Sequence, residues 1–166
     1  LIFRHKLVIY YFMTKNKYLS FFIILLITFA ASGIGGFTTS SFKEPWYSQI
    51  ILPSYNPPSW VFAPVWTLLY IFMSVAAWSA WIKKSNKKVL KIYFVHLFFN
   101  GIWSVIFFGF HKIGLALIDL LIILIFIILL MKFYLQENKI SFYLFIPYFL
   151  WSSYALVLNA SIFFLN

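Results

Sequence analysis

Widely spaced charges divide this sequence into five apolar stretches, each long enough to cross a lipid bilayer. The stretches run from Lys17 to Lys43, Glu44 to Lys83, Lys91 to Lys112, Lys112 to Lys132, and onward from Lys139. A membrane-spanning helix needs about 20 mostly apolar residues. The runs are continuous and do not alternate with polar residues, which favours helices over the strands of a membrane barrel. We therefore predict an all-α membrane protein, a bundle of five transmembrane helices.

The composition agrees with a membrane protein and excludes other classes. Hydrophobic residues make up 64% of the chain and charged residues 10%, whereas soluble domains are about half apolar and a quarter charged. Cysteine is absent, which excludes disulfides and cysteine-based metal or redox sites. The net charge of +10 is not read as a nucleic-acid footprint, because the lysines flank the apolar segments, where they anchor helices. We expect the lipid bilayer as a partner, no nucleic acid and no metal site.

Residues 1–17 form a basic and apolar tail that we set apart from the fold. The stretch "LIFRHKLVIYYF" precedes Met13, and "MTKNKYLSFF" looks like an ordinary start, so the first twelve residues are interpreted as upstream sequence. They lack the small-residue cleavage site of a signal peptide. We expect residues 18–166 to form one transmembrane domain.

The basic residues also predict the orientation. With five spans, eleven of the thirteen Lys and Arg residues lie on the side of the N-terminus, and only Lys43 and Lys112 lie on the other side. Basic residues accumulate on the cytoplasmic side of membrane proteins. We therefore expect a multi-pass protein of a bacterial cell membrane with its N-terminus in the cytoplasm. The connection "SYNPPSW", residues 54–60, would then face outward.

Two helical stripes combine polar and aromatic residues. One holds His96, Asn100, Trp103 and Phe107, and the other holds Trp151, Ala155, Asn159 and Ile162. Each set falls on one helix face. The asparagines either hydrogen-bond between helices or contact a ligand. His96 is expected at the membrane interface rather than on a metal, and axial haem ligation by His96 or His111 is the minor alternative.

Other intramembrane polar residues leave two interpretations open. Thr28, Ser32 and Gly36 are spaced by four, which favours close helix packing over ligand contact. Asp119 is the one acid inside a predicted span, and a carboxyl group there needs a partner or a proton. It serves either as a hydrogen-bonding group between helices or as a ligand contact.

The aromatic residues indicate a ligand. They make up 24% of the chain, and interfacial belts do not explain Trp60, Trp66, Tyr70, Trp103 and Trp151, which lie near the turn or on inward stripes. Flat, polarizable walls suit a flat, apolar molecule. The prolines of SYNPPSW restrict the backbone, so this connection is predicted to be a stiff lid that places Trp60 and Phe62 over the mouth of the bundle.

Four ordered blocks of this sequence resemble one family. "PSYNPPSWVFAPVWTLLYIFM" is similar to the signature of the TspO/MBR family, the tryptophan-rich sensory proteins related to the mitochondrial translocator protein. "GGFTT…PWYSQIILP", "FFNGIWSVIFFGFHKIGLALIDLL" and "PYFLWSSYALVLNASIFFLN" resemble the end of its first helix, its third and fourth helices, and its last helix. The match runs from about Tyr18 to Asn166.

The resemblance implies a five-helix fold, usually a homodimer, that binds porphyrins such as protoporphyrin IX and haem near the first connection. No obligatory cofactor is expected. Carried over by motif, the ligand-binding residues would be Tyr47, Pro57, Phe62, Trp66, Tyr70, Asn100, Trp103, Phe107, Trp151, Ala155 and Asn159. Asp119 stands where the family often has Glu, and it completes the candidate set. Sterol binding is doubtful, because "NASIFFLN" lacks the tyrosine and basic residue of the animal cholesterol pattern.

Three functions follow as hypotheses. The first is a tetrapyrrole-binding sensor, regulator or transporter. The second is a light-dependent porphyrin-degrading enzyme, which the resemblance would assign to Trp66 and Trp151; no paired acids or Ser/His/Asp set predicts other catalysis. The third is a structural membrane partner in which the same residues only fill space.

Overall fold

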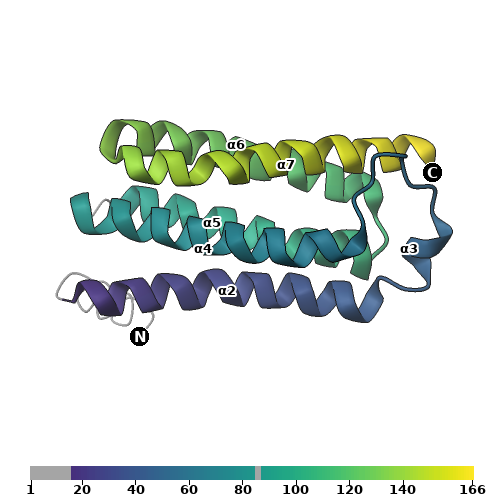
Figure 1. The fold of residues 1–166 in the computed structure, drawn as a ribbon, viewed down its shortest axis with the longest axis horizontal. Helices are drawn as coiled ribbons and strands as arrows, with labels where there is room; N and C mark the ends of the chain where they lie inside the picture. Colours follow the sequence, from purple (N-terminus) through teal and green to yellow (C-terminus); the bar gives the residue numbers. More distant parts are fainter. Residues whose placement is uncertain (1–15, 85–86) are drawn as a thin grey trace.

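The computed structural model describes residues 16–84 and 87–166, and within them the chain forms five long helices (Figure 1). These are α2 (Lys17–Phe42), α4 (Ser59–Lys84), α5 (Lys87–Ser104) continued by the π-helix η1 (Val105–Gly109), α6 (Ile113–Glu137) and α7 (Lys139–Leu165). Each is long and apolar enough to cross a membrane. The predicted five-helix all-α fold is confirmed. The tail before Asn16 and the expected start at Met13 lie outside the described residues.

Two helices do not begin or end at the charged residues that the sequence analysis used as their limits. The third span begins at Lys87 rather than Lys91, and the fourth continues past Lys132 to Glu137. A lysine side chain is long enough to reach water from within the last turns of a helix. A lysine therefore marks the approach of the membrane surface rather than the end of a helix.

One residue, Asn138, connects α6 to α7. Its side-chain oxygen accepts a hydrogen bond from the backbone N–H of Ile140 at 3.2 Å, which caps the start of α7. Its side-chain nitrogen donates to Ser79 Oγ on α4 at 2.7 Å. The backbone N–H of Asn138 itself donates to Tyr134 O at 2.7 Å. Asn138 thus ends one helix, starts the next and ties the turn to a third helix.

A short π-helical segment ends α5. In η1 the backbone N–H of Phe110 donates to Val105 O at 2.9 Å, and that of Lys112 donates to Ile106 O at 3.1 Å. The wider turn brings the consecutive side chains of Phe107 and Phe108 both into the interior. Such insertions often occur at functional sites.

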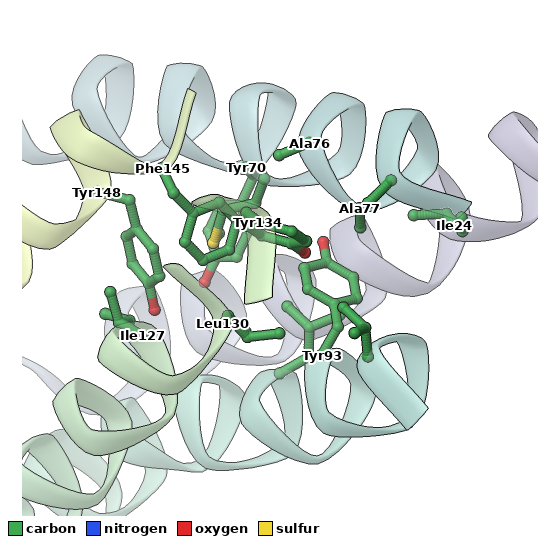
Figure 2. Close-up of a cluster of buried hydrophobic side chains, with 14 of the residues drawn as sticks. Ile24, Tyr70, Ala76, Ala77, Tyr93, Ile127, Leu130, Tyr134, Phe145 and Tyr148 are labelled. Atoms are coloured by element: carbon green, nitrogen blue, oxygen red, sulfur yellow. The ribbon is translucent and has the colours of Figure 1, made fainter. Parts of the chain in front are cut away.

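The end of the bundle away from α3 is solidly packed. Figure 2 shows side chains of α2, α4, α5, α6 and α7 meeting in this cluster. Several of its largest members are tyrosines, and Tyr93, Tyr134 and Tyr148 have no exposed surface. Tyr93 OH and Thr28 Oγ1 lie 2.7 Å apart, so Thr28 serves helix packing as the sequence suggested. This half of the molecule leaves little room for a ligand.

The connection between α2 and α4 covers the other end. It contains the short helix α3 (Trp46–Gln49), and the chain that follows α3 passes the C-terminal end of α7 in Figure 1. The side chain of Asn166 bonds both backbone groups of Ile51, at 2.9 Å to its N–H and 3.0 Å to its carbonyl. Tyr154 OH donates to Tyr55 O at 2.7 Å. The connection is therefore fastened to α7.

Candidate functional site

A cavity of about 500 Å³ lies between the helices at the end covered by α3. This volume is within the range of about 300–1,000 Å³ that small-molecule sites occupy. Its lining includes side chains from each of the five long helices, and from α3 and η1. The bundle therefore has one packed half and one hollow half.

Aromatic rings from four segments form the apolar wall of the cavity. Trp103 stacks on Phe107, with ring centroids 5.0 Å apart and an interplanar angle of 18°. Phe62 meets Trp151 edge to face at 6.0 Å. Trp66 lies 5.7 Å from Tyr70. Rings held this way by their neighbours keep flat faces available to a bound ring system.

Buried hydrogen bonds form the inner end of the cavity. Tyr70 OH donates to Asn100 Oδ1, and Asn100 Nδ2 donates to Tyr148 OH at 2.9 Å. Tyr148 OH in turn lies 2.7 Å from His96 Nε2. An amide side chain has two acceptor positions and two donor hydrogens, so Asn100 keeps capacity for one more partner of each kind.

The second asparagine ties three helices together. Asn159 Oδ1 on α7 accepts from Trp103 Nε1 on α5 at 3.3 Å, and its Nδ2 donates to Ile113 O on α6 at 3.1 Å. The sequence left open whether the asparagines bond between helices or face a ligand. Both make inter-helix hydrogen bonds, and both also line the cavity.

Ser152 is a polar residue of the lining that the sequence did not single out. It is 1% exposed, and its Oγ lies near the Tyr148 hydroxyl but makes no hydrogen bond of ordinary geometry with the described residues. A buried hydroxyl without a partner loses free energy, typically about 1–3 kcal/mol. A polar atom of a ligand or a water molecule in the cavity would satisfy it.

The wall formed by α2 carries small side chains instead of rings. Ser32, Gly36 and Ser40 continue the four-residue spacing from Thr28, and all three line the cavity. A Cβ added at Gly36 would meet no atom within 4 Å. The sequence favoured helix packing for these small residues. Thr28 does pack against a neighbouring helix, whereas Ser32 and Gly36 line the cavity. The small residues continue at the same four-residue spacing as far as Ser40, and this longer run could have indicated a cavity wall.

Tyr47 on α3 lies at the outer end of the cavity. Its hydroxyl donates to Asn56 Oδ1 at 3.3 Å. Partial burial raises the pKa of Tyr47 above its ordinary value, against a lowering by the Asn56 hydrogen bond and with a further rise from nearby Glu44. Tyr47 is therefore a neutral hydroxyl at physiological pH.

Ten of the twelve predicted site residues line this one cavity: Tyr47, Phe62, Trp66, Tyr70, Asn100, Trp103, Phe107, Trp151, Ala155 and Asn159. Pro57 does not, because it lies in the connection outside the lining, where its carbonyl accepts from Asn56 Nδ2 at 3.2 Å. Asp119 is buried but is not part of the lining; the adjacent Leu120 is, and successive residues of a helix point about 100° apart.

Two other expectations need correction. Trp60 does not cover the mouth: it is 75% exposed and is not part of the lining, whereas Phe62 is. His96 is not interfacial, because it is fully buried against Tyr148. Neither His96 nor His111 lines the cavity; His111 stacks on Trp46 with centroids 4.4 Å apart. Within the described residues, no three His, Cys, Asp or Glu side chains gather as a metal site.

Sequence comparisons place this architecture in a known class of membrane proteins. The profile of the TspO/MBR family matches residues 22–165, and the chain belongs to that family. The chain is 33% identical to tryptophan-rich protein TspO of Archaeoglobus fulgidus, over 89% of this chain and 94% of that protein. It is 34% identical to the tryptophan-rich sensory protein of Cereibacter sphaeroides, over 81% and 87% of the two chains. It is 32% identical to the human translocator protein, over 78% and 82%. With its five apolar helices, this is a multi-pass membrane protein.

Proposed function

We propose that the chain binds a tetrapyrrole such as protoporphyrin IX or haem in the cavity and acts as a sensor, regulator or transporter of that ligand in the membrane. The observation that carries the proposal is the convergence of Trp66, Trp103 and Trp151, from three helices, on one cavity of about 500 Å³. Flat aromatic walls favour a large, flat, apolar ring system. One of the relatives is named a sensory protein and another a translocator protein, which supports a role coupled to ligand binding.

The polar groups of the lining fit the rest of such a ligand. Asn100 and Ser152 retain hydrogen-bonding capacity toward the cavity. The described lining contains no histidine, so a porphyrin would be recognised by its shape and stacking, and haem would be held without an axial histidine from these residues. This favours metal-free protoporphyrin IX as the first ligand to test.

The experiment is a titration of the purified protein in nanodiscs with protoporphyrin IX, followed by the Soret absorbance and by quenching of tryptophan fluorescence. We expect saturable binding of one porphyrin per chain. Empty nanodiscs measure partition of the porphyrin into lipid and serve as the control. Binding that does not exceed this partition would leave a structural role for the aromatic residues and contradict the proposal.

Light-dependent degradation of the porphyrin is a second candidate, because Trp66 and Trp151 both line the cavity. Tryptophan is oxidised more readily than phenylalanine, so it could take part in a photochemical reaction with the ligand. Illumination of the loaded protein followed by product analysis separates the two functions. A binding protein returns the porphyrin unchanged, whereas an enzyme releases the same product in successive turnovers.

A further inference from the structure

A lysine stands at the outer end of the cavity. Lys43 follows the last residue of α2, its side chain is 25% exposed, and it is the one cationic residue among the described residues that line the cavity. In the sequence analysis, Lys43 served only to predict the orientation in the membrane. Its position in the cavity lining indicates that it also has a role toward a ligand.

The contacts of Lys43 leave its ammonium group able to accept a new partner. Nζ donates to Ser59 Oγ, at the start of α4, at 3.0 Å. Glu44 Oε1 is 3.8 Å away, an ion pair that is too long for a hydrogen bond. The ring centroid of Tyr47 lies 5.0 Å from Nζ. An ammonium group has three donor hydrogens, so two remain after the bond to Ser59.

Glu44 is a weak competitor for this cation. Its side chain is 55% exposed, so it keeps much of its hydration where it is. A carboxylate that approaches Nζ to ordinary hydrogen-bond distance, about 2.8 Å, would interact more strongly than Glu44 does, because Coulomb attraction grows as distance shrinks. A carboxylate on a ligand would also be partly sheltered from water by Tyr47 and Ser59.

The cavity is polar at its two ends and aromatic between them. Ser59 at the outer end and Tyr70 at the inner end lie eleven residues apart on α4, or about 16 Å along the helix at 1.5 Å per residue. Trp66, Trp103 and Trp151 line the space. A ligand that fills this space places one edge at Lys43 and its apolar body against the rings.

We propose that Lys43 is the carboxylate anchor of the cavity: it selects flat, apolar ligands that carry an ionised carboxylate on one edge, and it fixes that edge at the outer end. The inference rests on the proposed function and adds to it the chemical class and the orientation of the ligand. The two donor hydrogens of Lys43 that Ser59 does not use are the ones that would bind the carboxylate.

The test compares a diacid with its neutral ester. Dissociation constants are measured for protoporphyrin IX and its dimethyl ester in nanodiscs of phosphatidylcholine alone, so that no anionic lipid competes for the lysine. We expect the wild-type chain to bind the diacid about two- to fivefold more tightly than the diester, the range of a partly exposed ion pair. Lys43→Gln should remove this preference by weakening the diacid alone, and the unchanged affinity for the diester shows that the variant is folded.

Lys112→Gln is the matched control. It removes the same charge at the same end of the bundle, but Lys112 is exposed and is not part of the lining. It should keep the preference for the diacid, and Glu44→Gln should keep or increase it. Raising the salt concentration from about 0.05 to 0.5 M should reduce the preference in the wild type, because salt screens exposed charges.

The outcomes separate the inference from the proposed function. Saturable binding of both compounds with the same ratio in the wild type and in Lys43→Gln would overturn the role of Lys43 and leave tetrapyrrole binding in place. An equal loss of preference in Lys112→Gln would show a general charge effect and would also overturn it. Binding of neither compound above lipid partition would overturn the proposed function and this inference with it.

Discussion

Tyr148 on α7 and His96 on α5 meet in the interior of the bundle, with the tyrosine hydroxyl 2.7 Å from Nε2 of the histidine. Asn100 donates to the same hydroxyl at 2.9 Å. Tyr148 therefore serves two polar side chains that are themselves buried. This relationship fixes the inner end of the cavity, since Asn100 lines it and His96 lies behind it.

Removing that hydroxyl should destabilise the protein. Tyr148→Phe keeps the ring and leaves His96 Nε2 and Asn100 Nδ2 without this partner. A buried polar group that loses its partner costs about 1–3 kcal/mol, so the free energy of unfolding should fall by about that amount. Denaturation by SDS in mixed micelles measures it. Tyr143→Phe, at a side chain that is 64% exposed, is the control and should change stability little. Equal effects of the two variants would contradict this role of Tyr148.

The tryptophans of the cavity wall should contribute unequally to binding and to photochemistry. Trp66→Phe and Trp151→Phe keep most of the apolar surface, so protoporphyrin affinity should fall by about 1 kcal/mol or less. The alanine variants remove a large contact and should cost about 2 kcal/mol or more. If the porphyrin is degraded in light, the phenylalanine variants should slow bleaching far more than they weaken binding.

Fluorescence titration gives the protoporphyrin affinity, and the bleaching rate of the same purified samples gives the rate of degradation in light. Trp60→Ala is the matched control, because Trp60 lies on the same helix as Trp66 but is 75% exposed and outside the lining. It should bind as the wild type does. Unchanged binding in both cavity alanine variants, with the helix content retained, would place the ligand elsewhere.

Filling the cavity from the side of α2 should block the ligand without unfolding the chain. A side chain at Gly36 enters open space in the lining, so Gly36→Phe should fold and should reduce porphyrin affinity by at least about tenfold. Phenylalanine is also a better helix former than glycine. Gly33→Phe adds the same ring where there is also open space but no cavity lining, and it should bind normally. Equal porphyrin affinities of the two variants would show that the porphyrin does not bind in this cavity.

The charge distribution predicts the orientation in the membrane. Among the described residues, eight lysines lie near the end of the bundle that holds the α4–α5 and α6–α7 connections, and Lys43 and Lys112 lie at the other end. A reporter fused after Asn166 should therefore be extracytoplasmic. Activity of a reporter pair that functions on opposite sides of the membrane provides the measurement. A cytoplasmic reporter signal in a plasma membrane would reverse the assignment.

Sterol should be a poor ligand. The stretch after Asn159 has no basic residue, and its tyrosine position is not filled by tyrosine. We expect cholesterol to bind well below protoporphyrin IX in a competition titration in the same nanodiscs. Comparable affinities would show that the missing pattern does not control sterol binding.

The sequence predicted the five helices because apolar stretches of spanning length leave few alternatives in a membrane. The inward faces of two helices could also be predicted, because Asn100 and Trp151 each belong to a set of polar and aromatic residues at helical spacing. The π-helical turn at Val105–Gly109 could not, because it depends on how α5 meets its neighbours and not on a local signal.

Single-residue errors had a geometric origin. Asp119 attracted attention by its charge, but the helix turns its neighbour Leu120 toward the cavity instead. Lys43 was assigned to the membrane surface, and its place in the lining depends on the packing of α2 beside α4, which hydropathy does not determine. Residue type therefore identified most of the wall, while the direction of each side chain required the fold.

The one-residue turn at Asn138 sets the rotational phase of α7 relative to α6. With no spare residue between the helices, an insertion or deletion there cannot be absorbed in a loop, and each added helical residue would turn the following helix by about 100°. Trp151, Ala155 and Asn159 would swing away from the cavity together, although they lie at the far end of the molecule from the turn. Length variation at Asn138 should therefore be as damaging to the cavity as changes made inside it.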